Sequence, residues 1–421
     1  MLTLVLLAQF WGPSDDVRPF EKDARLVAAH YLIDYEADAG AFVDHPPGWK
    51  GFSGRSADWH RTQLAEMRKA GIDVALVRGG AEAVKALAEA LDEGPRVAPV
   101  AGSFDDARAF YALVPPRHWA LLGKRPLVWM APGSKPPFDA VRAGFKDVGR
   151  DPFIVAEEGG DATVAWGAAR TGPREFDVVS VGPGFDDGRP KEAVARDGGR
   201  RYEKAWYVAL RLRPRIIAIE TWNNFRDATE VCESREHGRA YLDITAKGAD
   251  KHHRGEALPR PTGRWSKYDR AVWNLKYEPF EGGLRPVEAD DGLFKKVDLA
   301  GIDVLTTKEN DKGSVRCLYF DVDDSWSFWE TRNFAITVEY LDLGQGSFAL
   351  EYDSADASLA RSLRPYKRAG EHAFTGTGEW KFARFELKEA LFANRQSGGG
   401  DFRLVIDKRG LSVRRVTVRP N

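Results

Sequence analysis

The sequence predicts a (β/α)₈ barrel followed by an antiparallel β-sandwich. In the first 250 residues, eight short and almost wholly apolar runs alternate with segments whose apolar residues recur at helical spacing. From about residue 287 onward the pattern changes to short alternating runs separated by Gly, Asp and Ser turns, which is typical of antiparallel strands. The length of 421 residues fits one barrel of about 250 residues and one smaller module.

The eight expected strands are apolar, as the strands of a parallel sheet must be when both faces are buried. They lie at 26–35, 72–77, 96–101, 126–131, 152–157, 163–166, 177–181 and 215–222. Helical spacing predicts helices at 56–70, 81–91, 105–113, 137–148, 192–212 and 236–247. Ser56 suits the N-cap of the first helix, and Gly71 ends it. Eight strands favour a barrel over an open doubly wound sheet, and no Gly-rich phosphate loop follows the first strand.

Changes of composition divide the chain into segments. We expect an N-terminal segment at 1–20, the barrel at 21–250, a Pro-, Gly- and charge-rich linker at 251–284, and the sandwich at 285–421. Residues 1–8 are apolar but too few to span a bilayer, which needs roughly 20, and no later run is long enough. The run is like the apolar part of a secretory signal without its basic stretch. We therefore expect an extracellular or periplasmic protein, with the cytoplasm as the alternative, and no membrane span.

Composition narrows the function classes. Lys and Arg total 62 and Asp and Glu total 63, so the net charge of −1 argues against a nucleic-acid partner. Two cysteines exclude a disulfide-dense scaffold, and Cys232 and Cys317 are expected to be separate thiols rather than a disulfide. Thirteen tryptophans offer flat faces that suit sugar rings, although core packing explains them equally well. Nothing in the sequence sets an oligomeric state.

Acidic and aromatic residues gather at the predicted carboxyl ends of the strands, where the active sites of such barrels lie. The carboxylates there are Asp34, Glu157, Asp186, Glu220 and Asp227, and the aromatic residues are Tyr31, Trp129, Trp166 and Trp222. Glycoside hydrolysis needs two carboxyl groups, one to protonate the leaving oxygen and one to assist attack. Taken as a set, this rim favours a carbohydrate site. Any one of the acids could instead only pair with Arg78, Arg189 or Arg226.

The segment after the last predicted strand carries a motif. It reads Glu220-Thr-Trp-Asn-Asn-Phe-Arg-Asp-Ala-Thr-Glu, followed by Ser-Arg-Glu-His-Gly-Arg-Ala-Tyr, and resembles E-T-W-N-E-F-H-E-G-T…S-x-E-Y-G-x-x-Y of the glycoside hydrolase family 99-like proteins. The segments His30–Tyr35, Trp59–Asp73 and Val181–Tyr202 are also similar to the uncharacterised bacterial members of that group. The resemblance implies a (β/α)₈ barrel acting on oligo- or polysaccharide, with a jelly-roll sandwich like a carbohydrate-binding module at the C-terminus.

The motif departs from the family at its two acids. The resemblance places the family's base and acid, both Glu, at Asn224 and Asp227, and Arg226 stands where the family has His. One reading is an active glycosidase that uses Glu220 and Asp227 with Glu157 or Asp186. The other is a degenerate relative that binds glycans without cleaving them. In either reading the expected substrate contacts are Tyr31, Asp34, Trp129, Trp166, Asp186, Trp222, Asn223, Asn224 and Arg226.

Metals and cofactors are not expected. The eight histidines show no zinc spacing. Asp321, Asp323 and Asp324 offer the hard oxygen ligands that Ca²⁺ prefers, but they lack the full loop pattern and favour a solvated turn. In the sandwich, Trp326, Trp329, Tyr352 and Tyr366 are candidate sugar platforms, with core packing expected for at least half of them.

Overall fold

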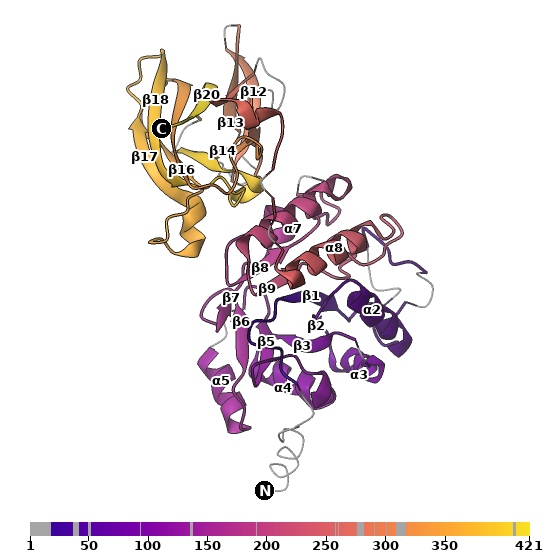
Figure 1. Cartoon of the computed structure of the whole chain (residues 1–421). Coiled ribbons are helices and arrows are strands. Elements are labelled where there is room, and N and C mark those ends of the chain that lie inside the picture. The colour runs from indigo at the N-terminus through magenta and orange to yellow at the C-terminus, as the bar shows by residue number, and fades with distance from the viewer. Residues whose placement is uncertain are drawn as a thin grey trace. The chain divides into compact units, whose positions relative to one another are not determined.

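The structure is a computed structural model. It describes residues 18–36, 42–48, 52–92, 94–134, 138–190, 192–256, 258–259, 261–275, 282–289, 291–299, 301–308, 317–406 and 410–421. The chain forms two compact units, Met1–Leu258 and Pro259–Asn421 (Figure 1). Within the described residues, no helix is long and apolar enough to cross a bilayer.

The first unit is the predicted barrel of parallel strands. The strands run in the order β7-β6-β5-β3-β2-β1-β9-β8, and a parallel bridge between Val164 and Val178 closes the ring. They are β1 (Leu26–Leu32), β2 (Val74–Arg78), β3 (Arg96–Ala101), β5 (Arg125–Met130), β6 (Phe153–Ala156), β7 (Ala162–Thr163), β8 (Val178–Val181) and β9 (Ile216–Ile219). A short β4 (Leu121–Leu122) adds an antiparallel pair to β5.

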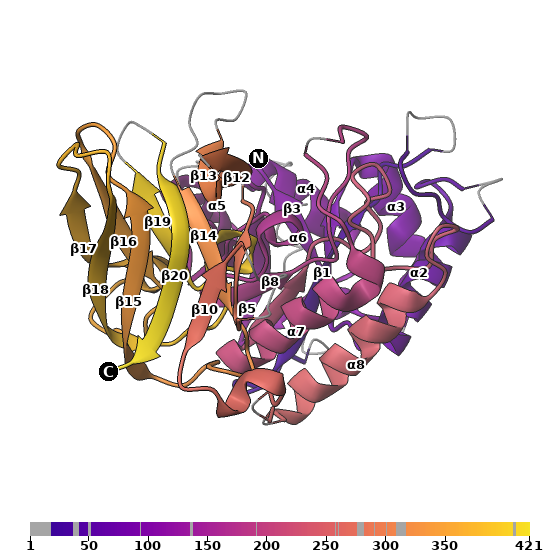
Figure 2. The same ribbon diagram turned by 90° about the horizontal axis from the view of Figure 1, so that it is seen from above.

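Helices follow the strands and cover the outside of the ring (Figure 1). They are α2 (Ala57–Lys69), α3 (Ala81–Ala90), α4 (Phe104–Leu113), α5 (Phe138–Asp147), α6 (Ala168–Thr171), α7 (Arg200–Leu212) and α8 (Ala240–Arg254), and Figure 2 shows α7 beside α8. As predicted, the Ser56 hydroxyl caps α2 by accepting the Trp59 N–H. Helix α7 begins at Arg200 rather than at residue 192, because Gly198 and Gly199 adopt positive φ just before it.

Alternation along each strand separates the lumen of the barrel from the layer beneath the helices. On β1, Leu26 and Ala28 pack in the lumen with Trp129 of β5, whereas Val27 and Tyr31 pack in the helix layer. The same alternation carries His30, the next residue of the Leu26–Ala28 row, to the lumen. The carboxyl end of the lumen is therefore the place to look for a site.

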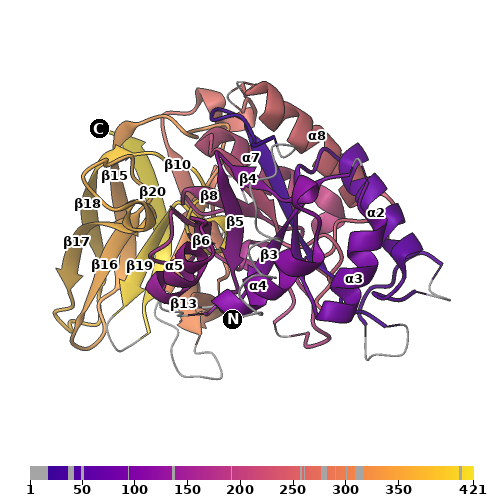
Figure 3. The same cartoon turned by 90° about the horizontal axis from the view of Figure 1, so that it is seen from below.

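The second unit is a sandwich of two antiparallel sheets (Figure 3). One sheet has the order β12-β13-β20-β15-β18 with β10 on β20, and the other has the order β11-β14-β19-β16-β17. The strands are β10 (Ala271–Asn274), β11 (Leu284–Val287), β12 (Leu293–Leu299), β13 (Ile302–Lys308), β14 (Cys317–Val322), β15 (Arg332–Leu341), β16 (Ser347–Tyr352), β17 (Lys367–Ala373), β18 (Trp380–Ala390), β19 (Phe402–Ile406) and β20 (Ser412–Pro420). The expected linker at 251–284 contains the end of α8 and the strand β10.

The acidic turn of the sandwich is occupied by protein partners. Asp321 pairs with Arg285 at 2.9 Å between the nearest charged atoms. Asp323 accepts the backbone N–H of Ser325 at 2.9 Å, and Asp324 accepts the Asn394 amide at 2.8 Å. Each of the three acids therefore has at least one protein partner among the described residues.

Two of the four expected sugar platforms in the sandwich lie in its core. Trp326 and Tyr352 are buried, whereas Trp329 and Tyr366 are half-buried. The thiols of Cys232 and Cys317, expected to be separate, are both buried and free.

Candidate active site

His30 lies between two tryptophans at the carboxyl end of the lumen. Its ring meets Trp129 edge-on at 5.2 Å and Trp166 edge-on at 4.8 Å between ring centroids. Burial, and then the charge of Arg78, lower the pKa of His30 to about 3. The imidazole is therefore neutral at physiological pH, and within the described residues its Nε2 has no hydrogen-bond partner. Trp129 is buried, whereas Trp166 is half-buried and keeps part of its surface accessible.

Glu220 follows β9 and is a buried carboxyl group among the predicted catalytic acids. It is 2% exposed. Its carboxylate accepts the backbone N–H of Gly167 at 3.0 and 3.1 Å and that of Ala169 at 3.4 Å. Burial raises the pKa of Glu220 to about 7, against the opposing pull of these N–H groups and of Arg174. Both protonation states are therefore populated at neutral pH, as a group that gives and takes a proton requires.

Asn224 and Asp227 form one hydrogen-bonded chain with Tyr35. The Tyr35 hydroxyl donates to Asn224 Oδ1 at 2.9 Å, and Asn224 Nδ2 donates to Asp227 Oδ2 at 2.7 Å. Asn224 is 9% exposed and Asp227 is half-buried. The amide at position 224 thus fixes one carboxylate oxygen of Asp227. Tyr35 was not among the expected substrate contacts, although it is the last residue of the first predicted strand.

The neighbouring motif residues hold the backbone. Asn223 donates to the carbonyl of Leu32 at 2.7 Å and accepts its N–H at 2.9 Å, so one side chain ties the end of β1 to the segment after β9. The Trp222 indole N–H donates to Gln63 of α2 at 2.7 Å. Tyr31 contacts His60 of the same helix through its hydroxyl at 2.7 Å. Because Trp222 and Tyr31 are fully buried in the helix layer, we leave both out of the proposed site.

The other predicted acids lie on loops at the same end of the barrel. Glu157 is exposed and accepts the N–H of Gly133 at 2.8 Å, and Asp34 is exposed and accepts the N–H of Gly80 at 2.7 Å. Asp186 is half-buried, and its backbone N–H donates to the carbonyl of Asp227 at 2.9 Å. Among these three acids, this contact ties Asp186 directly to the motif.

Arg226 is exposed on the loop after β9. Its guanidinium lies 5.3 Å from the centroid of the Tyr35 ring and 5.8 Å from that of Phe42. At these cation–π distances, the positive charge of Arg226 lies beside the Tyr35–Asn224–Asp227 chain.

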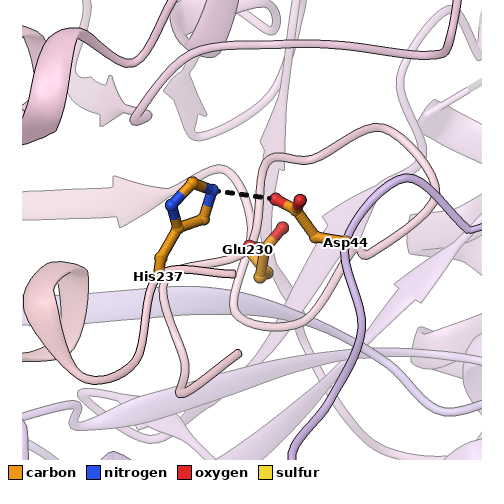
Figure 4. Close-up of side chains that lie close together, drawn as sticks. All are labelled: Asp44, Glu230 and His237. Carbon is orange, nitrogen blue, oxygen red and sulfur yellow. Dashed lines mark hydrogen bonds and ion pairs between the residues drawn. The ribbon is translucent and has the colours of Figure 1, made fainter. Parts of the chain in front are cut away.

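A second charged cluster lies on the loops around the motif (Figure 4). Asp44, Glu230 and His237 each bring one potential ligand atom to within 4.8 Å of the others. His237 Nε2 contacts Asp44 Oδ2 at 3.1 Å. The Arg196 guanidinium lies 3.2 Å from Asp44 and 2.7 Å from Glu230. Sequence reasoning missed this cluster: Glu230 and His237 lie in the quoted motif segments, but Asp44 and Arg196 come from two other loops, and no local pattern joins them to the motif.

Comparison with known proteins gives structural likenesses only. No protein-family model and no curated protein match the chain. Among solved structures, the chain is similar to a GH99 endo-α-mannosidase from Bacteroides thetaiotaomicron, with 16% identity, coverage of 54% of this chain and 98% of that one, and a TM-score of 0.43. The group that the motif resembles is therefore among the structures found.

Two further structures are similar over different parts of the chain. A glycoside hydrolase-like protein has 13% identity, covers 57% of this chain and 98% of its own, and has a TM-score of 0.40. The C-terminal CBM6 of LamC from Zobellia galactanivorans has 14% identity, covers 32% of this chain and 98% of its own, and has a TM-score of 0.20. At such TM-scores the fold rests on the strand pairing described above.

Proposed function

We propose that this protein is a glycoside hydrolase acting on an oligo- or polysaccharide at the carboxyl end of the barrel. The observation that carries the proposal is Glu220, a buried carboxyl group with a pKa of about 7 at the end of β9. The neutral imidazole of His30 and the half-buried face of Trp166 supply a hydrogen-bonding group and an apolar face, which together suit an uncharged sugar ring, and the buried Trp129 also contacts the His30 ring.

The two carboxyl groups take different roles in this proposal. Glu220 in its protonated form donates its proton to the leaving oxygen. Asp227 assists attack from a position that Asn224 holds through its amide. Glu157 is a further carboxylate at the rim, and Asp34 and Asp186 offer hydrogen bonds to sugar hydroxyls.

A release assay tests the proposal. The protein is incubated with a panel of α-linked oligo- and polysaccharides, and new reducing ends are measured. Glu220→Gln and Asp227→Asn should each lower turnover at least 100-fold, in line with loss of a catalytic acid or base, whereas the exposed control Glu158→Gln should not. Wild-type turnover in both variants would remove these residues from the mechanism.

Asn224 favours a second candidate function. An amide cannot accept a proton as a carboxylate does, and here it is engaged on both sides by Tyr35 and Asp227. A protein that binds glycans without cleaving them would keep the aromatic lumen and need no base. This alternative predicts saturable binding in calorimetry with no reducing ends released over long incubation, and measurable release would reject it.

A further inference from the structure

Arg196 lies at the centre of the second charged cluster and contacts three structural segments. It follows β8, and its Nη2 pairs with Asp44, which follows β1, and with Glu230, which follows β9. Its Nη1 donates to the backbone carbonyl of Glu230 at 3.0 Å. The guanidinium also lies over the ring of Tyr241 of α8, 4.6 Å from its centroid. Since the arginine side chain is only 9% exposed, it belongs to the packed interior of these loops.

Arg196 and burial act in opposite directions on the two acids of the cluster. Burial raises the pKa of Glu230 well above its usual range despite the Arg196 charge. Burial acts the same way on Asp44, but hydrogen bonds with His237 and Glu230 and the Arg196 charge outweigh it and lower the pKa of Asp44. Nη2 of Arg196 thus lies within ion-pair distance of both acids, so the cluster has a buried cation from the chain itself.

Backbone hydrogen bonds connect this cluster to the proposed catalytic motif. The N–H groups of Val43 and Asp44 both donate to the carbonyl of Phe225, at 3.0 and 3.1 Å, between Asn224 and Asp227 in the chain. The loop that carries Arg196 also carries Asp186, whose N–H donates to the Asp227 carbonyl. The cluster and the motif thus share the same three loops.

A glycine makes room for this arrangement. Gly184, on the loop after β8, has φ of 143°, and a Cβ there would lie 2.9 Å from Cγ of Arg196 and 2.7 Å from the carbonyl oxygen of Val194. The backbone at Gly184 packs against the aliphatic part of the Arg196 side chain. We therefore expect a displacement of Arg196 to move the segment that holds Asp186.

We propose that Arg196 is a positioning residue for the reaction: by clamping the loops after β1, β8 and β9 together, it sets the position of Asp227. The inference rests on the proposed hydrolase function. The arginine touches no reacting group, so its loss should impair the chemical step more than substrate binding.

The experiment compares Arg196→Met with the matched control Arg189→Met, an exposed arginine on the same loop that pairs with Asp187. On the glycan that the wild type cleaves, Arg196→Met should lower kcat about ten- to hundredfold with little change in KM. Arg196→Lys should recover part of the loss, and the control should match the wild type. Equal kcat in Arg196→Met and the wild type would overturn the proposal.

Hydrogen exchange supplies a readout that needs no activity. The amides of Val43, Asp44 and Asp186 should exchange faster in Arg196→Met than in the control. If the wild type cleaves no glycan, the hydrolase function fails, while the exchange rates still decide whether Arg196 holds the loops. Unchanged exchange refutes the clamp. Should Arg196→Met not fold, Asp44→Asn, which removes the carboxylate partner, takes its place in the same comparison.

A cation titration tests the competing arrangement. Ca²⁺ or Zn²⁺ is added to the wild type and to Asp44→Asn, and the melting temperature is followed. Neither ion should raise the wild-type value above that of the variant. A rise confined to the wild type would show that the trio Asp44, Glu230 and His237 binds a metal and would overturn the clamp.

Discussion

Replacing Glu220 by Gln should remove a large part of the pH dependence of stability. The substitution keeps the shape of the side chain and removes its ionisation. In the folded protein the pKa is raised to about 7 from an ordinary value of 4.5. When folding raises the pKa of a carboxyl group, the contribution of that group to stability is complete below its pKa in the unfolded chain. The contribution is lost as the pH rises through its pKa in the folded protein. The wild type should therefore lose stability between about pH 4.5 and pH 7.

The size of this loss follows from the shift. A difference of roughly 2.5 pKa units corresponds to about 3 kcal/mol, at 1.36 kcal/mol per unit. Glu220 is almost fully buried, so solvent does not screen the effect. Gln loses an acceptor for the Gly167 and Ala169 N–H groups at every pH, which lowers its stability by a constant amount of about 1–3 kcal/mol. The difference between the two proteins should still change by about 3 kcal/mol across the interval.

Urea unfolding of the barrel, followed by tryptophan fluorescence at pH 4.5, 6, 7 and 8, measures this difference. Subtracting the free energy of unfolding of one protein from that of the other cancels the contribution of every titrating group that they share. Glu158→Gln, an exposed carboxyl on the loop after β6, should keep the wild-type slope. If the free energies of unfolding of the wild type and Glu220→Gln change equally with pH, burial does not raise the pKa of Glu220.

Further predictions concern the site and its supports. If Glu220 is the acid, glycan cleavage should fall above about pH 7, and a rate still rising to pH 9 would contradict that role. Trp166→Ala should weaken glycan binding about tenfold in calorimetry through loss of its half-buried face, whereas unaltered affinity would exclude a sugar platform there. Asn223→Ala should destabilise the barrel in urea by about 1–3 kcal/mol, since the N–H and the carbonyl of Leu32 lose their partner. Asn224→Glu restores the carboxyl that the resembled family has, and it should raise cleavage if the protein is a degenerate binder.

The sequence predicts the fold well because the barrel repeats one simple pattern. Each apolar strand run and most helix limits agree with the structure to within a few residues. The site was harder to predict. Tyr31 and His30 are neighbours on the same strand, and the alternation that sends them to opposite faces is visible in the sequence. Which of the two faces the lumen depends on how the strands pair, which no local pattern records.

Loop contacts set the rest of the site. The sequence alone does not tell whether Asn224 marks a lost catalytic group or supports another carboxylate. The hydrogen bonds from Tyr35 and to Asp227 favour the second interpretation. The partnership of Asp44 with Arg196 joins positions 152 residues apart, so this pair had no local signal either.

The closure of the barrel has a consequence for its motions. Within the described residues, β7, the shortest strand of the ring, joins β8 through one backbone bridge from Val164 to Val178 and through Thr163, whose N–H and hydroxyl donate to the Asp177 carboxylate just before β8. Since local opening is favoured where few bonds must break, this seam should open more readily than any other part of the ring. The Glu220 carboxylate bonds Gly167 and Ala169, just beyond the seam, and so acts as a brace across it. Ionisation of Glu220 would then change how often the seam between β7 and β8 opens.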